Sequence, residues 1–262
     1  TLSHSSAASD VYKRQAIYPS LKGKIIYITG GASGIGASTV RAFDRQGAIV
    51  GILDIDGASG KQLLNDLKGQ HEFVQCDLRD IDALTEAIST LESQLGKAQI
   101  LVNNAARDDR HDWREIDANY WNERMDINLR HMFFAIQQIA PWMIDAREGS
   151  IVNVGSNSWW ECGAGFPAYA TAKSAVHGLT RTMARELGAY NIRVNTVVPG
   201  WIMTKRQKEL WVTPEALQKQ LERQCIPTPI DPEYVANMIT FLSSQDAKMC
   251  TAGNFMVEGG SI

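Results

Sequence analysis

The sequence predicts an α/β protein, a single domain built on a doubly wound parallel sheet of about seven strands with helices on both faces. Short apolar, β-branched segments alternate with amphipathic segments along nearly the whole chain, as such a sheet requires. The apolar segments are almost continuously hydrophobic, which is typical of strands covered on both sides. No linker, composition shift or internal repeat divides the 262 residues, so one domain is expected.

The elements follow one another in a regular order. The first strand is expected over 24–29 and ends at Gly30-Gly31, and a helix over 35–46 follows, with Gly47 as its terminator. The second strand, over 48–53, ends at Asp54. Continuing this alternation, we expect helices over 57–68, 80–95, 118–144, 167–188 and 232–243, and strands over 72–76, 99–103, 150–155, 192–198 and 254–258.

Two regions stand outside this alternation. Residues 201–228 mix apolar and aromatic side chains with proline breakers, and an insertion between a strand end and a late helix is where a substrate lid is expected. The helix after it should begin with Asp231 as N-cap and Pro232 in the first turn.

Residues 1–19 are polar and lack the apolar run of a signal peptide. We expect them to be a flexible leader, with the domain spanning 20–262.

Composition limits the class of function. With 26 basic and 29 acidic residues, the net charge of −3 argues against a nucleic-acid or anionic-membrane partner. No window approaches the roughly 18 consecutive apolar residues of a membrane span. The cysteines form no CxxC or Cys/His cluster, so neither a metal site nor a redox pair is predicted, and reduced thiols in a cytoplasmic protein are expected. They are Cys76, Cys162, Cys225 and Cys250.

A glycine-rich turn, Thr29-Gly30-Gly31-Ala32-Ser33-Gly34-Ile35-Gly36, directly follows the first strand. Gly30 can turn without a Cβ clash, Gly34 lets the backbone approach a pyrophosphate, and Gly36 allows the helix to pack closely on the strand. The helix N-terminus presents free N–H groups to an anion. Because the turn lies between a strand and an amphipathic helix, it predicts dinucleotide binding in a Rossmann-type fold.

Asp54 is the residue that we expect to select the dinucleotide. It ends the second strand, 18 positions after Gly36, where the adenosine ribose should lie. A carboxylate there accepts hydrogen bonds from both ribose hydroxyls and repels a 2′-phosphate. No Arg or Lys lies in the glycine turn or immediately after Asp54. NAD is therefore predicted over NADP, with a solvated strand-end carboxylate as the alternative reading of Asp54.

Four side chains form a candidate catalytic group. Tyr169 and Lys173 are four positions apart on one predicted helix, so both project from one face. An ammonium beside a phenol lowers the phenol pKa below about 10, which makes Tyr169 a candidate general base. Ser156 follows the strand over 150–155 at the ligand edge of the sheet. Asn128 is a polar side chain in an apolar helix and needs a partner. Taken singly, Ser156 is equally a capping serine and Asn128 a satisfied core amide.

Residues from about 20 to 262 resemble the classical short-chain dehydrogenase/reductase family. TGGASGIG at 29–36, CDL at 76–78, NNAA at 103–106, IN at 127–128, GS at 155–156, YATAK at 169–173 and PG at 199–200 occur in that family's order. The resemblance implies hydride transfer between a carbinol carbon and a nicotinamide. The catalytic tetrad it implies is Asn128, Ser156, Tyr169 and Lys173, with Asn128 positioning a water and Lys173 binding the nicotinamide ribose.

The same resemblance implies a cofactor site and an assembly. Asp77 would hold the adenine amino group, Asn104-Ala105 would lie against the adenosine, and Thr204 would contact the nicotinamide half. A homotetramer through the two long helices over 118–144 and 167–188 is expected. The full set of implied cofactor contacts is Gly30, Ser33, Gly34, Ile35, Gly36, Asp54, Asp77, Leu78, Asn104, Ala105, Tyr169, Lys173, Pro199, Gly200, Ile202 and Thr204.

Charged residues beside tryptophans favour a polyol substrate. The DDRH segment at 108–111 should lie at the ligand edge near Trp159-Trp160, Trp201 and Trp211, although packing tryptophans and a solvated Asp108 are equally consistent with the sequence. AIYPSLKGK at 16–24, DDRH, NLRHM at 128–132, TKRQ at 204–207 and WVTPE at 211–215 resemble dehydrogenases that oxidise aldoses such as D-xylose, L-arabinose or L-fucose at C1 to the aldonolactone. The implied sugar contacts are Arg110, Ser156, Asn157, Trp159, Tyr169 and Trp201.

Two other functions stay open. One is oxidation or reduction of another secondary alcohol, including a 3-oxoacyl thioester. The other is an NAD-binding regulatory protein without turnover, although such a protein does not need all four groups of the tetrad.

Overall fold

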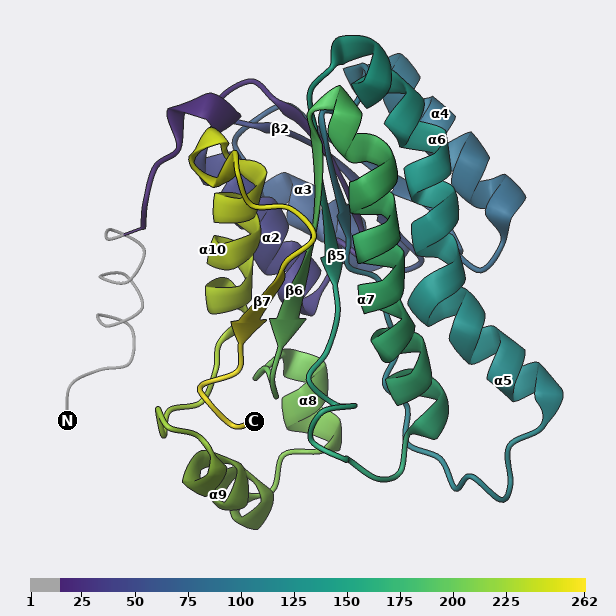
Figure 1. The fold of residues 1–262 in the computed structure, drawn as a ribbon, viewed down its shortest axis with the longest axis vertical. Coiled ribbons are helices and arrows are strands. Elements are labelled where there is room, and N and C mark those ends of the chain that lie inside the picture. Colours follow the sequence, from purple (N-terminus) through teal and green to yellow (C-terminus); the bar gives the residue numbers. More distant parts are fainter. Residues whose placement is uncertain (1–14) are drawn as a thin grey trace.

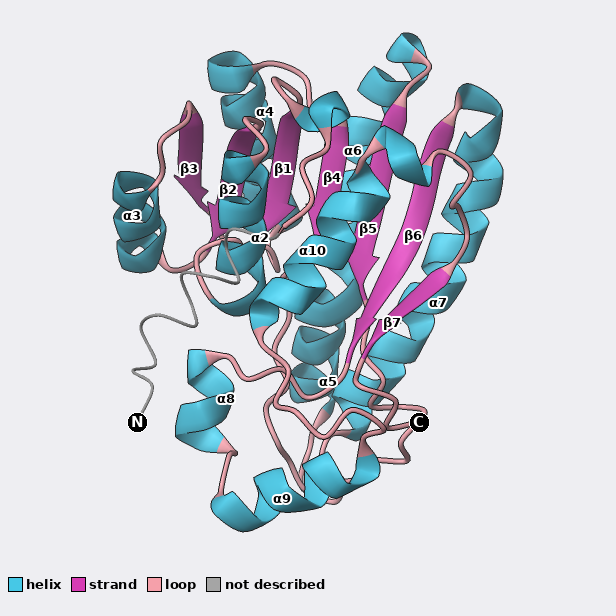
Figure 2. Cartoon of the chain, turned by 90° about the vertical axis from the view of Figure 1, so that its left-hand side faces the viewer, coloured by secondary structure: helices cyan, strands magenta, loops and turns pink. Residues whose placement is uncertain are grey.

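The computed structural model describes residues 15–262, and these residues form a seven-stranded sheet in the order β3-β2-β1-β4-β5-β6-β7. Every neighbouring pair is parallel, so the predicted doubly wound fold is confirmed (Figure 2). The strands are β1 (Ile25–Thr29), β2 (Ile49–Asp54), β3 (His71–Gln75), β4 (Ile100–Asn103), β5 (Gly149–Val154), β6 (Ile192–Pro199) and β7 (Asn254–Val257).

Helices cover both faces of the sheet (Figure 1). On one face α2 (Gly34–Arg45), α3 (Gly57–Asp66) and α10 (Pro232–Ser243) share a buried cluster with the strands. On the other face α4 (Ile81–Leu95), α6 (His131–Ala146) and α7 (Pro167–Leu187) share a second cluster. Tyr27 belongs to the second cluster and its neighbours Ile26 and Ile28 to the first. Successive strand side chains point to opposite faces, and both faces are covered, so β1 is apolar throughout.

The chain order of the strands reverses beside β1. From β1 the chain continues outward to β2 and β3, and it then returns to the other side of β1 as β4. Thr29 and Asn103 are paired at the carboxyl ends of these two strands. Loops leave a doubly wound sheet in opposite directions at such a point and open a crevice there.

The long helix predicted over 118–144 is corrected by the structure. It consists of α5 (Ala118–Met125), a π-helical segment η2 (Asp126–Arg130) and α6. The apolar periodicity runs across the junction, which is why the sequence indicates one helix. Wide π turns occur often at functional positions, and this one contains Asn128.

The predicted lid region contains two short helices, α8 (Lys205–Leu210) and α9 (Pro214–Arg223), beyond the carboxyl ends of the strands (Figure 2). The side chains of Thr204 and Thr213 cap them by accepting hydrogen bonds from the third residue that follows each. Asp231 lies at the N-cap of α10 as predicted, but its side chain makes no capping hydrogen bond.

The predicted leader over 1–19 lies mostly outside the described residues. Within them, Gln46 accepts a hydrogen bond from the amide of Tyr18 and donates one to the carbonyl of Ala16. A single 3₁₀ turn, η1 (Pro19–Leu21), then leads to β1 and buries Leu21. Contacts with the domain thus begin at Ala16, before residue 20. In residues 15–262 no helix combines the length and the apolar character that a membrane crossing requires.

Candidate active site

A cavity of about 1110 Å³ opens at the carboxyl ends of the strands, between the sheet and helices α8 and α9. It brings together most of the residues predicted from the sequence. Those lining it are Gly30, Ser33, Gly34, Ile35, Asp54, Asp77, Leu78, Asn104, Ala105, Arg110, Ser156, Asn157, Tyr169, Lys173, Pro199, Gly200, Trp201, Ile202 and Thr204. Gly36, Asn128 and Trp159 do not line it.

The glycine turn passes very close to its neighbours. Gly30 has φ +64°, and a Cβ there would lie 2.7 Å from the Cα of Ala105. Gly36 packs against the turn and does not line the cavity. A Cβ there would lie 1.9 Å from the carbonyl oxygen of Gly30. The side-chain amide of Asn104 donates to the carbonyls of Thr29 and Gly30, 3.1 and 2.8 Å away. These contacts tie the end of β4 to the turn.

Asp54 is held against the same turn. One carboxylate oxygen accepts a hydrogen bond from the amide of Ala32 at 2.9 Å, and the other accepts from the amide of Asp56 at 3.0 Å. The carboxylate therefore has a defined place between β2 and the N-terminus of α2. A group bound against the turn would meet this negative charge.

Lys173 and Tyr169 project from α7 toward the end of β5. The Lys173 side chain is 1% exposed, and its Nζ donates a 2.7 Å hydrogen bond to the carbonyl of Val154. Nζ lies 5.8 Å from the centroid of the Tyr169 ring. Ser156 follows β5 and accepts a hydrogen bond from the amide of Ser158 at 3.1 Å. The three predicted catalytic groups thus share one wall of the cavity.

The pKa of Tyr169 is not lowered in this structure, contrary to the expectation from the Tyr–Lys spacing. Burial raises the pKa of the phenol, and the charge of Asp108 acts in the same direction. The Ser156 hydroxyl and the charge of Arg110 oppose these effects without overcoming them. Burial also lowers the pKa of Lys173 to about 7. Removing charged groups from water disfavours both phenolate and ammonium, so the four-residue spacing alone does not lower the pKa of Tyr169.

Asn128 uses its side chain on the protein backbone. Its Oδ1 accepts from the amide of Arg107 at 2.9 Å, and its Nδ2 donates to the carbonyls of Arg107 and Arg124 at 3.1 and 2.9 Å. These contacts agree with the alternative of a satisfied core amide. They join the π-helical segment to the loop that follows β4, and this loop carries Asp108 and Arg110. The role in positioning a water stays a prediction.

The predicted sugar contacts separate into two groups. Arg110 lies over the ring of Phe166, 4.1 Å from its centroid, and 5.4 Å from the ring of Trp211. The indole N–H of Trp201 donates to Gln207 at 2.8 Å. The amide of Asn157 donates to Glu161 at 2.8 Å. Arg110, Trp201 and Asn157, together with Ser156 and Tyr169, all line the cavity.

Trp159 is the exception and corrects the sequence interpretation. Its ring stacks on Trp160 with centroids 3.9 Å apart, and its indole N–H donates to His177 at 3.3 Å. His177 in turn contacts Asn254 at 2.8 Å. With its indole N–H bound to His177 and one ring face against Trp160, Trp159 packs against the scaffold and does not reach the cavity.

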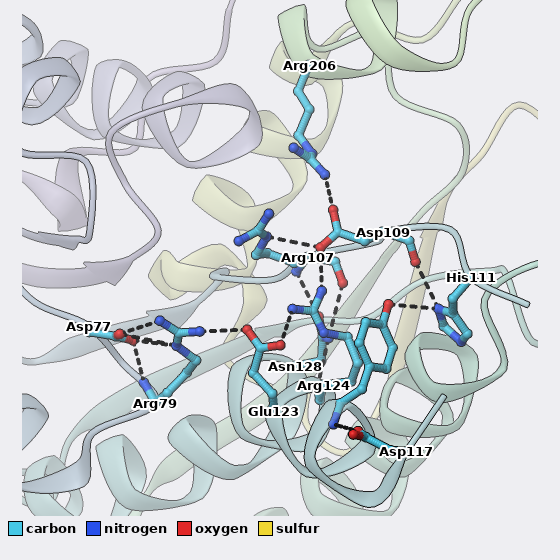
Figure 3. Close-up of polar contacts among 11 residues, drawn as sticks. Asp77, Arg79, Arg107, Asp109, His111, Asp117, Glu123, Arg124, Asn128 and Arg206 are labelled. Atoms are coloured by element: carbon cyan, nitrogen blue, oxygen red, sulfur yellow. Dashed lines mark hydrogen bonds and ion pairs between the residues drawn. The ribbon is translucent and has the colours of Figure 1, made fainter. Parts of the chain in front are cut away.

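A chain of ion pairs, shown in Figure 3, was not predicted. Arg79 contacts both oxygens of Asp77, so this predicted adenine contact already holds a partner, and the pairing lowers the pKa of the Asp77 carboxyl. Arg124, whose side chain is 3% exposed, lies between Glu123 and Asp109. The chain runs through Asp77, Arg79, Glu123, Arg124, Asp109 and Arg206. It joins the end of β3, helix α5, the loop after β4 and helix α8 at the rim of the site.

Within residues 15–262, no group of three or more His, Cys, Asp or Glu side chains is arranged to hold a metal ion. The described cysteines Cys76, Cys162, Cys225 and Cys250 are all free thiols.

Comparison with known proteins agrees with this geometry. Residues 30–261 match the family profile described as enoyl-(acyl carrier protein) reductase. The chain is 44% identical to D-xylose 1-dehydrogenase of Caulobacter vibrioides, over 94% of this chain and 98% of that protein. It is 40% identical to a probable galactose dehydrogenase of Rhizobium meliloti, over 93% and 96% of the two chains.

Solved structures of relatives carry either dinucleotide. A 3-oxoacyl-[acyl-carrier protein] reductase with bound NAD from Brucella melitensis matches with a TM-score of 0.85 and 32% identity, over 94% of each chain. A blue fluorescent protein from a metagenomic library, in complex with NADPH, matches with a TM-score of 0.85 and 31% identity, over 92% and 99% of the two chains.

The fold, the cavity and these relatives define an oxidoreductase that uses a nicotinamide dinucleotide and acts on the CH–OH group of its donor. The chain belongs to the short-chain dehydrogenase/reductase family, as its motifs predict. Within that family it is similar in sequence to dehydrogenases named for D-xylose and galactose.

Proposed function

We propose that this dehydrogenase oxidises the C1 hydroxyl of an aldose with NAD⁺ and releases the aldonolactone. The observation that carries the proposal is the convergence of Ser156, Tyr169 and Lys173 on a cavity that Asp54 and the glycine turn also line. The names of the two relatives with 44% and 40% identity support an aldose as the substrate.

The described residues fit a nicotinamide dinucleotide. Gly30 and Gly34 have positive φ, and the turn that they form lines the cavity at the N-terminus of α2, where backbone N–H groups suit a pyrophosphate. The Asp54 carboxylate, held by the amides of Ala32 and Asp56, suits the ribose hydroxyls and opposes a 2′-phosphate. This supports NAD over NADP. When bound, the nicotinamide ring supplies the acceptor for the hydride that leaves C1.

Tyr169 is the proton acceptor in the proposed mechanism. As the C1–H bond breaks, the C1 hydroxyl gives its proton to the Tyr169 oxygen, and the C1–O bond becomes a carbonyl. Ser156 hydrogen-bonds the reacting oxygen and thereby orients it. Lys173 binds a ribose hydroxyl of the cofactor and, when protonated, favours the phenolate electrostatically. Because burial raises the pKa of Tyr169, the phenolate depends on positive charge gathered beside it in the working complex.

Asn128 contributes by holding the loop after β4 in place. Its amide bonds hold Arg107 in place, and Asp108 and Arg110 follow directly in the sequence. A proton path that continues through a water held near Asn128 is part of the proposal.

The cavity suits a polyol better than an acyl chain. Arg110 and Asp108 place charges in its wall, and Trp201, Trp211 and Phe166 supply aromatic faces. Sugar hydroxyls can pair with charged groups while the sugar C–H faces stack on rings. An acyl chain would remove the same charges from water without replacing their hydrogen bonds.

A substrate panel tests this function. We expect the highest kcat/KM with an aldose and NAD⁺, followed as NADH formation, with D-xylose and D-galactose as the first substrates. A preference for a 3-oxoacyl thioester or another secondary alcohol would overturn the aldose assignment. Tight NADH binding without turnover of any alcohol would instead support a regulatory protein.

We also propose a cytoplasmic homotetramer that assembles through α5–α6 and α7. Trp121 on α5 and Phe133 on α6 are 37% and 40% exposed, so these helices present apolar side chains that a partner subunit would cover. The four free thiols support a reducing compartment. Light scattering of the purified chain should give four times the mass of one chain, and a monomer at micromolar concentration would contradict the assembly.

A further inference from the structure

Asp108 is a carboxylate in the cavity wall that is not among the predicted sugar contacts. It follows β4 in the loop that Asn128 fixes, and its side chain is 22% exposed. Its Oδ2 accepts a hydrogen bond from the side-chain amide of Gln207 at 2.7 Å. The carbonyl oxygen of that same amide accepts from the indole N–H of Trp201 at 2.8 Å. Two successive hydrogen bonds therefore orient this carboxylate from helix α8.

The second oxygen of Asp108 keeps its capacity to accept hydrogen bonds. The nearest guanidinium in an ion pair, Nε of Arg206, lies 3.6 Å from Oδ1, which is too long for a hydrogen bond. Arg110, two positions along the same loop, forms no ion pair with Asp108 in the described part of the chain. An ionised carboxylate offers about four lone-pair sites, and the side chain of Gln207 uses one of them.

The negative charge of Asp108 also affects the pKa values of Tyr169 and Lys173. It raises the pKa of Tyr169, and it raises the pKa of Lys173 against the effect of burial. Asp108, Tyr169 and Lys173 also line the same cavity, so one bound substrate can reach all three side chains. The next residue, Asp109, differs from Asp108. Its carboxylate oxygens pair with Arg124 and Arg206, and it does not line the cavity.

We infer that Asp108 determines substrate specificity, with Oδ1 accepting a hydrogen bond from one ring hydroxyl of the aldose while Gln207, fixed by Trp201, holds the carboxylate in position. The inference rests on the proposed function. A carboxylate only accepts hydrogen bonds, so a substrate without a donor at that place leaves it desolvated and unpaired. A site of this kind discriminates strongly against analogues that lack the hydroxyl.

The test compares Asp108→Asn with the wild type on the preferred aldose and on its 2-, 3- and 4-deoxy analogues. The asparagine keeps the size of the side chain and an acceptor for Gln207, and it loses the charge. We expect kcat/KM of the variant for the parent aldose to fall about 10- to 100-fold. For the one analogue that lacks the bonded hydroxyl, the wild type and the variant should differ little.

Two further variants separate recognition from a general disturbance. Asp109→Asn makes the same charge change one residue away, and its loss should be equal for the parent aldose and every deoxy analogue. Gln207→Met removes the group that positions Asp108. It should raise KM in the same analogue-dependent pattern as Asp108→Asn, whereas a merely structural role for Gln207 would affect all analogues equally. Thermal unfolding of each variant shows whether it is folded.

Each outcome decides the question. If the wild type oxidises an aldose and the Asp108→Asn loss concentrates on substrates with one particular hydroxyl, the inference stands. If the wild type oxidises an aldose and the loss is uniform across the deoxy series, the inference fails and the proposed function stands. If the wild type oxidises no aldose, both fail.

Discussion

The ammonium nitrogen of Lys173 lies 2.7 Å from the carbonyl oxygen of Val154, and this hydrogen bond joins α7 to the end of β5. Val154 is the last residue of β5, and Ser156 comes two positions later. The bond therefore sets the helix face that bears Tyr169 against the strand end that precedes Ser156. The alignment of the three groups depends on how one helix packs on one strand.

Replacing Tyr169 with phenylalanine should remove the proton acceptor and leave the fold intact. We expect kcat to fall by about 10²- to 10⁴-fold, the usual contribution of a general base, with little change in the midpoint of thermal unfolding. Steady-state NADH formation and calorimetry measure the two quantities. Turnover of the variant at the wild-type rate would refute the assignment.

The stability of the enzyme without cofactor should depend on pH through Lys173. Burial lowers the pKa of Lys173 to about 7, whereas an unfolded lysine keeps its proton up to about pH 10. Between these values the unfolded chain binds more protons, so this group makes stability rise with pH. The melting temperature of wild type minus that of Lys173→Met should increase from pH 7 to about 9. A constant difference would show that the burial of the charge is not costly.

Asp54 should control the choice of dinucleotide. Asp54→Asn removes the negative charge beside the glycine turn, and we expect the ratio of kcat/KM for NADP⁺ to that for NAD⁺ to rise at least about tenfold, which corresponds to about 1.4 kcal/mol. Initial rates with both dinucleotides at saturating aldose give this ratio. A wild type that already prefers NADP⁺ would contradict the role of Asp54.

Gly36 should tolerate no side chain. Gly36→Ala places a Cβ 1.9 Å from the carbonyl oxygen of Gly30, so we expect a loss of about 2–4 kcal/mol in the free energy of unfolding. Gly188→Ala is the matched control, because its Cβ meets nothing within 4 Å and its φ is −60°. That variant should be as stable as the wild type or about 0.4–1 kcal/mol more stable. Urea denaturation compares the two, and equal stabilities would contradict the steric argument.

Arg124 should stabilise the rim of the site. Its side chain is 3% exposed and pairs with Asp109 and Glu123, each about a third exposed. Arg124→Gln removes one ion-pair partner from each carboxylate. Because both carboxylates are partly in contact with water, we expect the free energy of unfolding to fall by only about 1–3 kcal/mol. Urea denaturation at low and high salt measures it. If the variant is as stable as the wild type, the attraction within the ion pairs only balances the cost of removing their charges from water, and the pairs do not stabilise the fold.

Much of the site was predictable because its signals are local in the sequence. The glycine turn, the strand-end Asp54, and the spacing of Tyr169 and Lys173 each lie within one turn or one helix. The parallel sheet then brings them to one edge, since a doubly wound fold gathers the carboxyl ends of its strands. The predicted strands agree with the observed ones to within two residues at each end, because short segments rich in apolar, β-branched residues lie between clear helical segments.

The tertiary structure decided what depends on residues far apart in the chain. Trp159 donates a hydrogen bond to His177, 18 positions away, and does not line the cavity. The sequence shows that residue 159 is aromatic but not which way its ring points. Asp108 meets Gln207, 99 positions away, because helix α8 returns over the loop after β4. Burial raises the pKa of Tyr169 although the four-residue spacing favours the opposite. Periodicity and spacing describe the neighbours of a residue along the chain, whereas hydrogen bonding, desolvation and charge pairing act between whichever groups the fold brings into contact.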